Sequence, residues 1–172
     1  MQSVELLLDP ATDAAVRAEW AALSAAGLPS QADHRGETNA PHVSVLAAEG
    51  FPEDEGSLPD AARAVPLPVR LGPPVLFGGR RLVLARLVVL DRALLDLHAG
   101  VVAALAGATG PSPHTVPGRW VPHVTLARGI RADGVAAALD ALGPERSGVP
   151  ELVGEATALR RWDPVARRAW EV

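Results

Sequence analysis

The stretch PHVSVLA occupies residues 41–47, and a near copy, PHVTLAR, occupies residues 122–128. Each copy reads Pro-His-Val and then a hydroxyl residue, followed by aliphatic residues. A short run rich in β-branched and aliphatic residues, entered from a polar or Gly/Pro loop, predicts a β-strand. One copy alone would be an ordinary half-buried strand, so the repetition is what calls for an explanation.

The polar residues of the two copies fall on one face of each predicted strand. Successive side chains of a strand point to opposite faces. His42 and Ser44 therefore share one face, and His123 and Thr125 share one face of the second strand. Each strand offers an apolar face to a core and a second face that carries one imidazole and one hydroxyl.

The segments around the copies follow a matching order of elements, which predicts a duplicated α+β unit. Gly78-Gly79 is a hairpin signal, and Asp91 is placed to cap a helix. Thr12 or Asp13 is expected to cap the first helix. We expect strands at 3–8, 42–47, 69–78, 80–90 and 121–128, helices from about 13 to 26 and at 58–64, 92–106 and 132–142, and two final strands joined at Asp163-Pro164.

A duplicated unit places the two polar faces opposite each other if its halves pack about a pseudo-twofold axis. The resulting cleft holds two imidazoles and two hydroxyls. One neutral imidazole can take a proton while a protonated one gives a proton to a leaving oxygen. The hydroxyls can donate hydrogen bonds to oxygens on which charge develops. This set of groups suits phosphoester chemistry without a metal.

Composition narrows the class of protein. The length of 172 residues predicts a single two-lobed domain spanning residues 1–172. The chain has a net charge of −4, no cysteine and no lysine. Disulfides, a cysteine nucleophile, a P-loop lysine and Schiff-base chemistry are excluded. The longest apolar run, LVLARLVVL, is interrupted by Arg86, and the N-terminus lacks the features of a signal peptide. We expect a soluble, cytoplasmic monomer with no membrane partner.

The paired segments His42-Val43-Ser44-Val45 and His123-Val124-Thr125-Leu126 resemble the two His-x-Ser/Thr-x motifs of the two-histidine (2H) phosphoesterase superfamily. PHVTLAR is typical of its bacterial branch of 2′-5′ RNA ligases and RNA 2′,3′-cyclic phosphodiesterases. The resemblance implies a bilobal fold with two antiparallel sheets around a central groove and helices outside.

The same resemblance implies the reaction and the catalytic set. It implies opening of a 2′,3′-cyclic phosphate on RNA ends or nucleotides to a 2′-phosphate, with no metal and no cofactor. The catalytic residues would be His42, Ser44, His123 and Thr125, with His123 as base and His42 as acid during hydrolysis. Ser44 replaces the commoner threonine, and the chain has no tyrosine to stack on a base. Ligation or cleavage of 2′-5′ bonds, and a non-catalytic RNA-end or nucleotide binder, are the alternatives.

Further candidates for substrate binding lie near the two copies. His34, Arg35 and Asn39 belong to the loop before the first copy, and solvated loop residues are the alternative interpretation. Trp120 precedes the second copy and suits either stacking on a base or core packing. Arg128 follows the second copy, but strict alternation puts it opposite His123, so contact with phosphate requires a bulge or a strand end.

For the remaining histidines a structural or solvated role is the favoured interpretation. His114 lies in the loop before the second copy, and His98 lies on a helix face that is otherwise apolar. Zinc binding by His42 and His123 is a weaker alternative, since no HExxH or His-x-His pattern accompanies them. The arginines of ALRRW and ARRAW suit an exposed strand face or, alternatively, a stripe that faces RNA.

Overall fold

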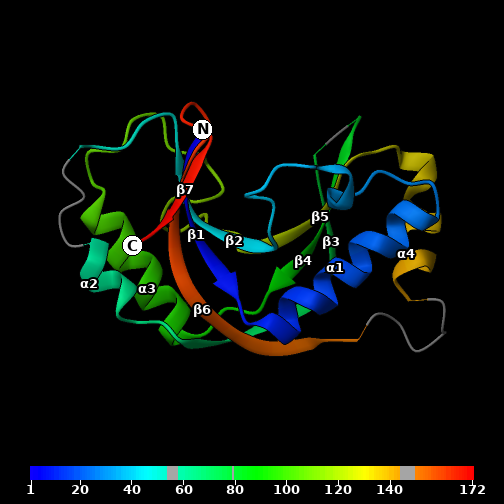
Figure 1. Ribbon diagram of the computed structural model, residues 1–172, viewed down its shortest axis with the longest axis horizontal. Coiled ribbons are helices and arrows are strands. Elements are labelled where there is room, and N and C mark those ends of the chain that lie inside the picture. The colour runs from blue at the N-terminus through cyan, green and yellow to red at the C-terminus, as the bar shows by residue number, and fades with distance from the viewer. Residues whose placement is uncertain (54–57, 79, 144–149) are drawn as a thin grey trace.

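The computed structural model describes residues 1–53, 58–78, 80–143 and 150–172 (Figure 1). The strands are β1 (Gln2–Leu8), β2 (His42–Ala48), β3 (Leu67–Gly78), β4 (Leu82–Val88), β5 (His123–Ile130), β6 (Leu152–Asp163) and β7 (Arg168–Glu171). The helices are α1 (Pro10–Ala25), α2 (Leu58–Ala62), α3 (Arg92–Ala104) and α4 (Val135–Leu142). Short 3-10 helices cover Gln31–Asp33 and Ala132–Gly134. The expected elements are thus present, with shifted ends; Gly79 of the expected hairpin turn lies outside the described residues.

The strands form one antiparallel sheet in the order β1-β2-β5-β4-β3-β6-β7, with a further pairing of β1 with β6. The first part of β6 pairs with β3, and its second part pairs with β1 and β7. In Figure 1 this long strand curves beneath the others from one side of the molecule to the other. The α+β fold is confirmed, and the two expected sheets are halves of one sheet that meet at β2–β5 and along β6.

The long helix of each half of the chain packs against the motif strand of the other half. Helix α1 precedes β2 in the chain but packs against β5, whereas α3 precedes β5 and packs against β2. Figure 1 shows α1 with α4 at one end of the molecule and α2 with α3 at the other. The motif strands therefore lie at the centre, where both halves hold them.

An aspartate caps each of the two long helices. Asp91 accepts a hydrogen bond from the backbone N–H of Leu94 at 2.8 Å, as expected. Helix α1, however, begins at Pro10 and its cap is Asp9, whose carboxylate accepts from the N–H of Ala11 and of Thr12. The expected cap at Thr12 or Asp13 is wrong because the helix begins earlier, at Pro10. Proline suits the first helical position, since a backbone N–H there would have no partner within the helix.

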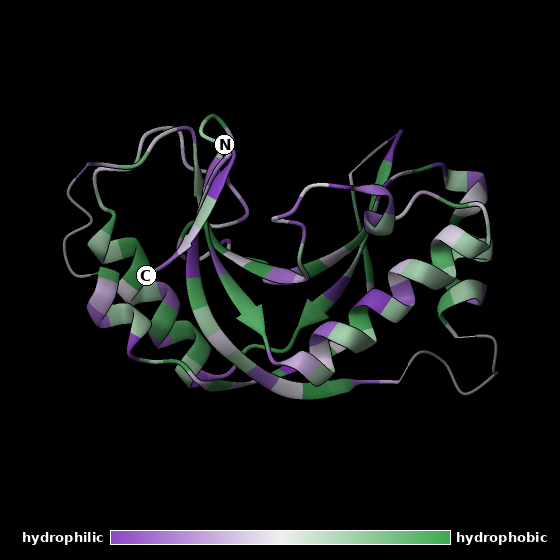
Figure 2. Cartoon of the chain, in the orientation of Figure 1, coloured by the Kyte–Doolittle hydropathy of each residue, from purple (hydrophilic) through white to green (hydrophobic). Residues whose placement is uncertain are grey.

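The core lies between the sheet and the helices. Val16, Trp20 and Leu23 of α1 are buried, as their helical spacing predicts. The buried residues of α3 are Leu94, Leu97, His98 and Val101, whereas Leu95 is 44% exposed. Figure 2 shows β1 and β4 as largely hydrophobic and the helices as mixtures of hydrophobic and hydrophilic residues. Within the described residues, no helix is long and apolar enough to cross a membrane.

Arg86 is the exception inside this core. Its side chain is 1% exposed, and its guanidinium forms an ion pair with Glu19 of α1. It also donates to the carbonyl oxygens of Gly72, at 3.1 Å, and Pro150, at 2.6 Å. A buried charge is tolerated only when it is paired and hydrogen-bonded, so Arg86 serves as a polar tie between α1, β3 and β4.

Candidate active site

The two motif strands meet at a single residue pair, Val43 opposite Val124. Because the strands are antiparallel, the next positions set His42 across from Thr125 and Ser44 across from His123. In this register the position of each imidazole is opposite the position of the hydroxyl residue in the other copy. The sequence predicted which residues share a face, and the structure brings the two faces together.

Both motif strands contain a β-bulge at the same position. The pairing of β1 with β2 skips Val45, and the pairing of β4 with β5 skips Leu126. An extra residue shifts the alternation of side chains by one. Arg128 consequently lies on the side of the motif histidines, where it lines one cavity with His42. The bulge that phosphate contact by Arg128 requires is thus present.

The two imidazoles are held in the same way. Nδ1 of His42 donates to the carbonyl oxygen of Ala40 at 2.7 Å, and Nδ1 of His123 donates to that of Val121 at 2.8 Å. A carbonyl oxygen only accepts, so Nδ1 carries a proton in both rings. Nε2 is therefore the atom at which each ring can gain or lose a proton.

His42 lies beside a buried carboxylate. Its Nε2 is 3.5 Å from Oε1 of Glu5, whose side chain is 4% exposed. Glu5 accepts from the hydroxyl of Ser3 at 2.7 Å and forms an ion pair with Nε of Arg160 at 2.8 Å. Arg160 in turn donates to the carbonyl oxygen of Thr38, in the loop before β2. His42 thus faces a negative charge that is fixed from two sides.

His123 lies among an aromatic ring and positive charges. The ring of Phe77 is 4.7 Å from the imidazole, centroid to centroid, and 6.3 Å from that of His114. Burial lowers the pKa of His123, and the charges of Arg128, His42 and His114 lower it further. The hydrogen bond to Val121 opposes this effect without cancelling it. The lowered pKa therefore favours the neutral form of His123.

Two tryptophans hold the motif strands at the bulges. Nε1 of Trp20 donates to the carbonyl oxygen of Thr125, and Nε1 of Trp120 donates to that of Ser44, both at 3.0 Å. Trp120 is 8% exposed and stacks on His98, with ring centroids 4.2 Å apart. Of the two alternatives for Trp120, the structure shows core packing. His98 is a buried structural histidine, as expected, and burial lowers its pKa.

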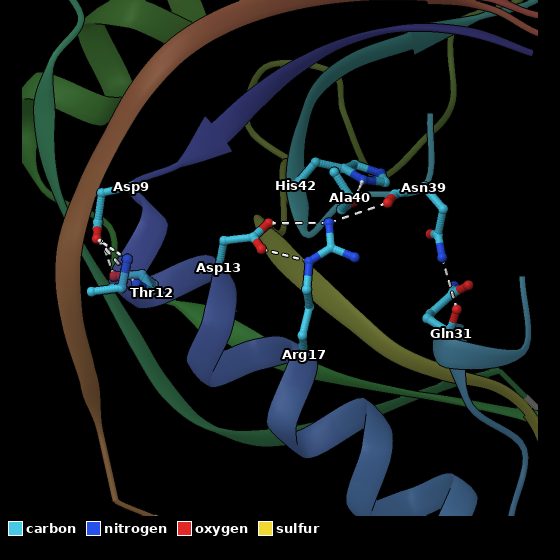
Figure 3. Close-up of polar contacts among 9 residues, drawn as sticks. Asp9, Thr12, Asp13, Arg17, Gln31, Asn39, Ala40 and His42 are labelled. Carbon is cyan, nitrogen blue, oxygen red and sulfur yellow. Dashed lines mark hydrogen bonds and ion pairs between the residues drawn. The ribbon is translucent and has the colours of Figure 1, made fainter. Parts of the chain in front are cut away.

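The loop before β2 is braced from within and by α1 (Figure 3). Asn39 uses both protons of its amide to bond the carbonyl oxygens of Gln31 and His34, each at 2.9 Å. The backbone carbonyl oxygen of Asn39 accepts a hydrogen bond from Arg17, which also forms an ion pair with Asp13. The amide nitrogen of Asn39 therefore fixes the loop, and its donors are not free for a ligand.

A cavity of about 760 Å³ opens on the His42 side of the motif strands. Its walls are the loop before β2, which carries His34 and Arg35, the motif side with Arg128, and the hairpin of β6 and β7. Trp120 and His123 are not among its lining residues. A second hollow, of about 730 Å³, contains no motif residue and is lined by Arg80, Arg81, Arg131, Ala132 and Asp133.

The sequence did not single out Glu5, Phe77 and Arg160 as part of this site. Glu5 sits in a strand that reads as apolar, and an acidic residue at an inward position was the available signal. The arginines of ALRRW were expected on an exposed face, which is wrong for Arg160 and Arg161. The side chain of Arg160 is 11% exposed, and Arg161 lies 4.5 Å from the ring of Phe51.

Two strands that each carry His-x-hydroxyl, paired at the centre of a duplicated α+β fold, define a two-histidine phosphoesterase. The family model of the 2′-5′ RNA ligase superfamily matches residues 10–165, so the chain belongs to this superfamily, which generally catalyses phosphoester reactions on RNA. The structure is similar to Usb1 of Kluyveromyces marxianus, with a TM-score of 0.51 and 15% identity over 99% of this chain and 96% of that one. This likeness concerns the fold. A comparison with curated proteins gives no match.

Proposed function

We propose that the protein opens the 2′,3′-cyclic phosphate of an RNA end or nucleotide and releases a 2′-phosphate. The observation that carries the proposal is the antiparallel pair of motif strands, in which both imidazoles are held by Nδ1 and keep Nε2 for proton transfer. Members of the superfamily act on RNA phosphoesters, and a site with two imidazoles and two hydroxyls supports this particular step.

The surroundings of the two histidines support different roles. Burial lowers the pKa of His123 and so favours its neutral form, which suits a general base. His42 takes the role of the acid, and the buried carboxylate of Glu5 lies 3.5 Å from its Nε2, where it can orient the ring. Arg128 can neutralise the phosphate, and the hydroxyls of Ser44 and Thr125 can donate to its non-bridging oxygens.

The proposed step balances without a further reactant. Nε2 of His123 takes a proton from water as the water oxygen forms a bond to phosphorus. The bond between phosphorus and O3′ breaks, and its electron pair stays on O3′, which takes the proton from Nε2 of His42. The product is a 2′-phosphate with a free 3′-hydroxyl, and solvent restores the protonation of both rings.

Adenosine 2′,3′-cyclic phosphate and a short RNA with the same end test this proposal, in EDTA, with the 2′- and 3′-phosphate products resolved. We expect a 2′-phosphate from the wild type and a loss of at least about 10²-fold in His42→Ala and in His123→Ala. Circular dichroism of both variants checks that the fold persists. A 3′-phosphate product, or full activity in either variant, would refute the mechanism.

The same assay separates the alternatives. An RNA with a 5′-hydroxyl end, added to the cyclic end, yields a 2′-5′ bond if the protein runs the step in the direction of ligation. The same groups serve both directions, because the acid of one is the base of the other. Binding of the cyclic end with no product at any pH would identify a binding protein instead.

A further inference from the structure

The cavity beside His42 contains more positive charge than a cyclic phosphate needs. Four arginines line it, and the chain as a whole has a net charge of −4. Two glutamates also line it, of which Glu5 is already paired with Arg160. Among the residues that the structure describes, no hydrogen bond or ion pair engages the guanidinium groups of Arg35, Arg128 or Arg167. Three arginines are therefore available to a ligand.

These three arginines lie on different walls. Arg128 follows the second motif, on the floor near the histidines, whereas Arg35 belongs to the loop before β2 and Arg167 to the β6–β7 turn. The loop and the hairpin are tied together, because Arg160 of β6 donates to the carbonyl oxygen of Thr38. The positive charge thus extends from the catalytic groups to an outer rim that is built from two connected segments.

The β6–β7 turn holds Arg167 in an unusual backbone conformation. The carboxylate of Asp163 accepts from the N–H of Val165 at 2.8 Å and from that of Ala166 at 3.1 Å, which closes the turn. Arg167 follows with φ of 50°. Glycine adopts this left-handed region without strain, so an arginine there is disfavoured by about 1–2 kcal/mol and calls for a reason beyond the turn itself.

We propose that Arg35 and Arg167 form a subsite for a second phosphate, one that lies on the same substrate beyond the cyclic phosphate. The inference rests on the proposed function, since it takes Arg128 and the motif groups to hold the reacting phosphate. The indole of Trp162, which also lines the cavity, offers a face to the nucleoside between the two phosphates. A volume of about 760 Å³ is within the range of pockets that enclose a ligand much larger than one phosphate.

Direct binding tests the subsite whether or not the protein turns over. The ligands are adenosine 2′-phosphate, adenosine 2′,5′-bisphosphate and the dinucleotide ApA with a terminal 2′-phosphate, titrated calorimetrically into the full chain. We expect one or both ligands with the second phosphate to bind about tenfold or more tightly than adenosine 2′-phosphate. A gain for the dinucleotide assigns the subsite to the internal phosphate of RNA, and a gain for the bisphosphate alone assigns it to a terminal phosphate.

The variants Arg35→Gln and Arg167→Gly attribute the gain to the rim. Glycine keeps the backbone at position 167 unstrained, so a loss there reports the guanidinium rather than the turn. In each variant the affinity ratio between extended and simple ligand should fall toward one, and Arg167→Lys should restore part of it. Arg92→Gln removes an arginine that is 88% exposed on α3, and it should leave the ratio at its wild-type value.

Equal affinity of the wild type for all three ligands, or a ratio that both rim variants keep, would overturn the subsite. Turnover of adenosine 2′,3′-cyclic phosphate is measured separately. Turnover with equal affinities would leave the proposed function in place and remove only the subsite. Tighter binding of the ligands with a second phosphate, without turnover, would keep the subsite and remove the proposed function.

Discussion

The two motif strands share a backbone and differ in what surrounds their imidazoles. Both have a bulge after the hydroxyl residue, a carbonyl oxygen that fixes Nδ1 and a tryptophan that caps a strand carbonyl. Beside Ser44, however, β1 places Glu5, and at the equivalent point beside Thr125, β4 places Ala85. Duplication thus accounts for the geometry, and divergence of the neighbouring strands accounts for two unlike histidines.

The largest effect on kcat/KM should appear when the two histidine variants are given a substrate with a different leaving group. An alkoxide leaving group needs a proton from His42, whereas 4-nitrophenolate departs as an anion. On a 4-nitrophenyl phosphodiester, His42→Ala should therefore recover most of the roughly 10²–10⁴-fold loss that it shows on the cyclic phosphate, and His123→Ala should recover none. The measurement is kcat/KM of both variants and the wild type on both substrates.

Recovery in His123→Ala alone would reverse the assignment of acid and base. Equal recovery in both variants would mean that the surroundings of the two imidazoles do not divide their roles. A double variant, His42→Ala with His123→Ala, serves as the control, since on the 4-nitrophenyl substrate it should be as inactive as His123→Ala alone.

An intermediate effect is expected on the pH dependence of kcat/KM, through His123 of the second copy. A general base must be neutral, so kcat/KM falls as the pH drops through the pKa of His123, and this limb should lie below the ordinary value of about 6.5. Burial is the main cause of the low pKa, and the charge of Arg128 adds to it. Phe77→Ala, which exposes the ring, and Arg128→Gln should each raise the pKa and move the acidic limb to higher pH, by roughly half a unit or more.

The profile of kcat/KM reports the free enzyme, so weaker substrate binding in Arg128→Gln lowers the curve without hiding the limb. Arg92→Gln, which removes a remote exposed arginine, is the matched control for loss of charge. Limbs that stay in place in both variants would show that neither group sets the pKa of His123.

The sequence predicted the motif geometry because strand alternation is a local property. His42, Ser44, His123 and Thr125 share a side for reasons that the letters alone contain, and the capping aspartate of α3 is equally local. What surrounds each imidazole depends on register between distant strands. Glu5 faces His42 because β1 pairs with both β2 and β6, and Phe77 reaches His123 because the β3–β4 hairpin lies beside β5.

Bulges mark the limit of the same argument. Strict alternation put Arg128 on the wrong face, and only the pairing of β4 with β5 reveals that Leu126 is an extra residue. Trp120 was ambiguous for a similar reason, since its indole meets Ser44 and His98, which are remote in sequence. Charge could not place Arg160 either, because its partner Glu5 lies at the other end of the chain.

The smallest effect separates the aspartates that cap the two long helices. Asp91 accepts one described N–H, that of Leu94, whereas Asp9 also bonds the hydroxyl of Thr12 at 2.6 Å and the N–H of Glu155 at 2.8 Å. Asp9→Ala should therefore lower the free energy of unfolding by about 2 kcal/mol, and Asp91→Ala by about 1 kcal/mol. Urea denaturation at pH 7 measures both.

The stability lost in Asp9→Ala should depend on pH. The hydrogen bond from Thr12, followed by that from Glu155, lowers the pKa of Asp9 from 3.8 to about 2. A carboxyl group with a depressed folded-state pKa contributes its full stabilisation above the unfolded value and loses it as the pH falls toward the folded one. The difference between wild type and Asp9→Ala should hence be constant from pH 7 to about 5 and shrink between pH 4 and 2. Equal losses in the two variants at pH 7, or a difference that persists undiminished at pH 2, would show that the extra bonds of Asp9 do not stabilise the first half of the molecule.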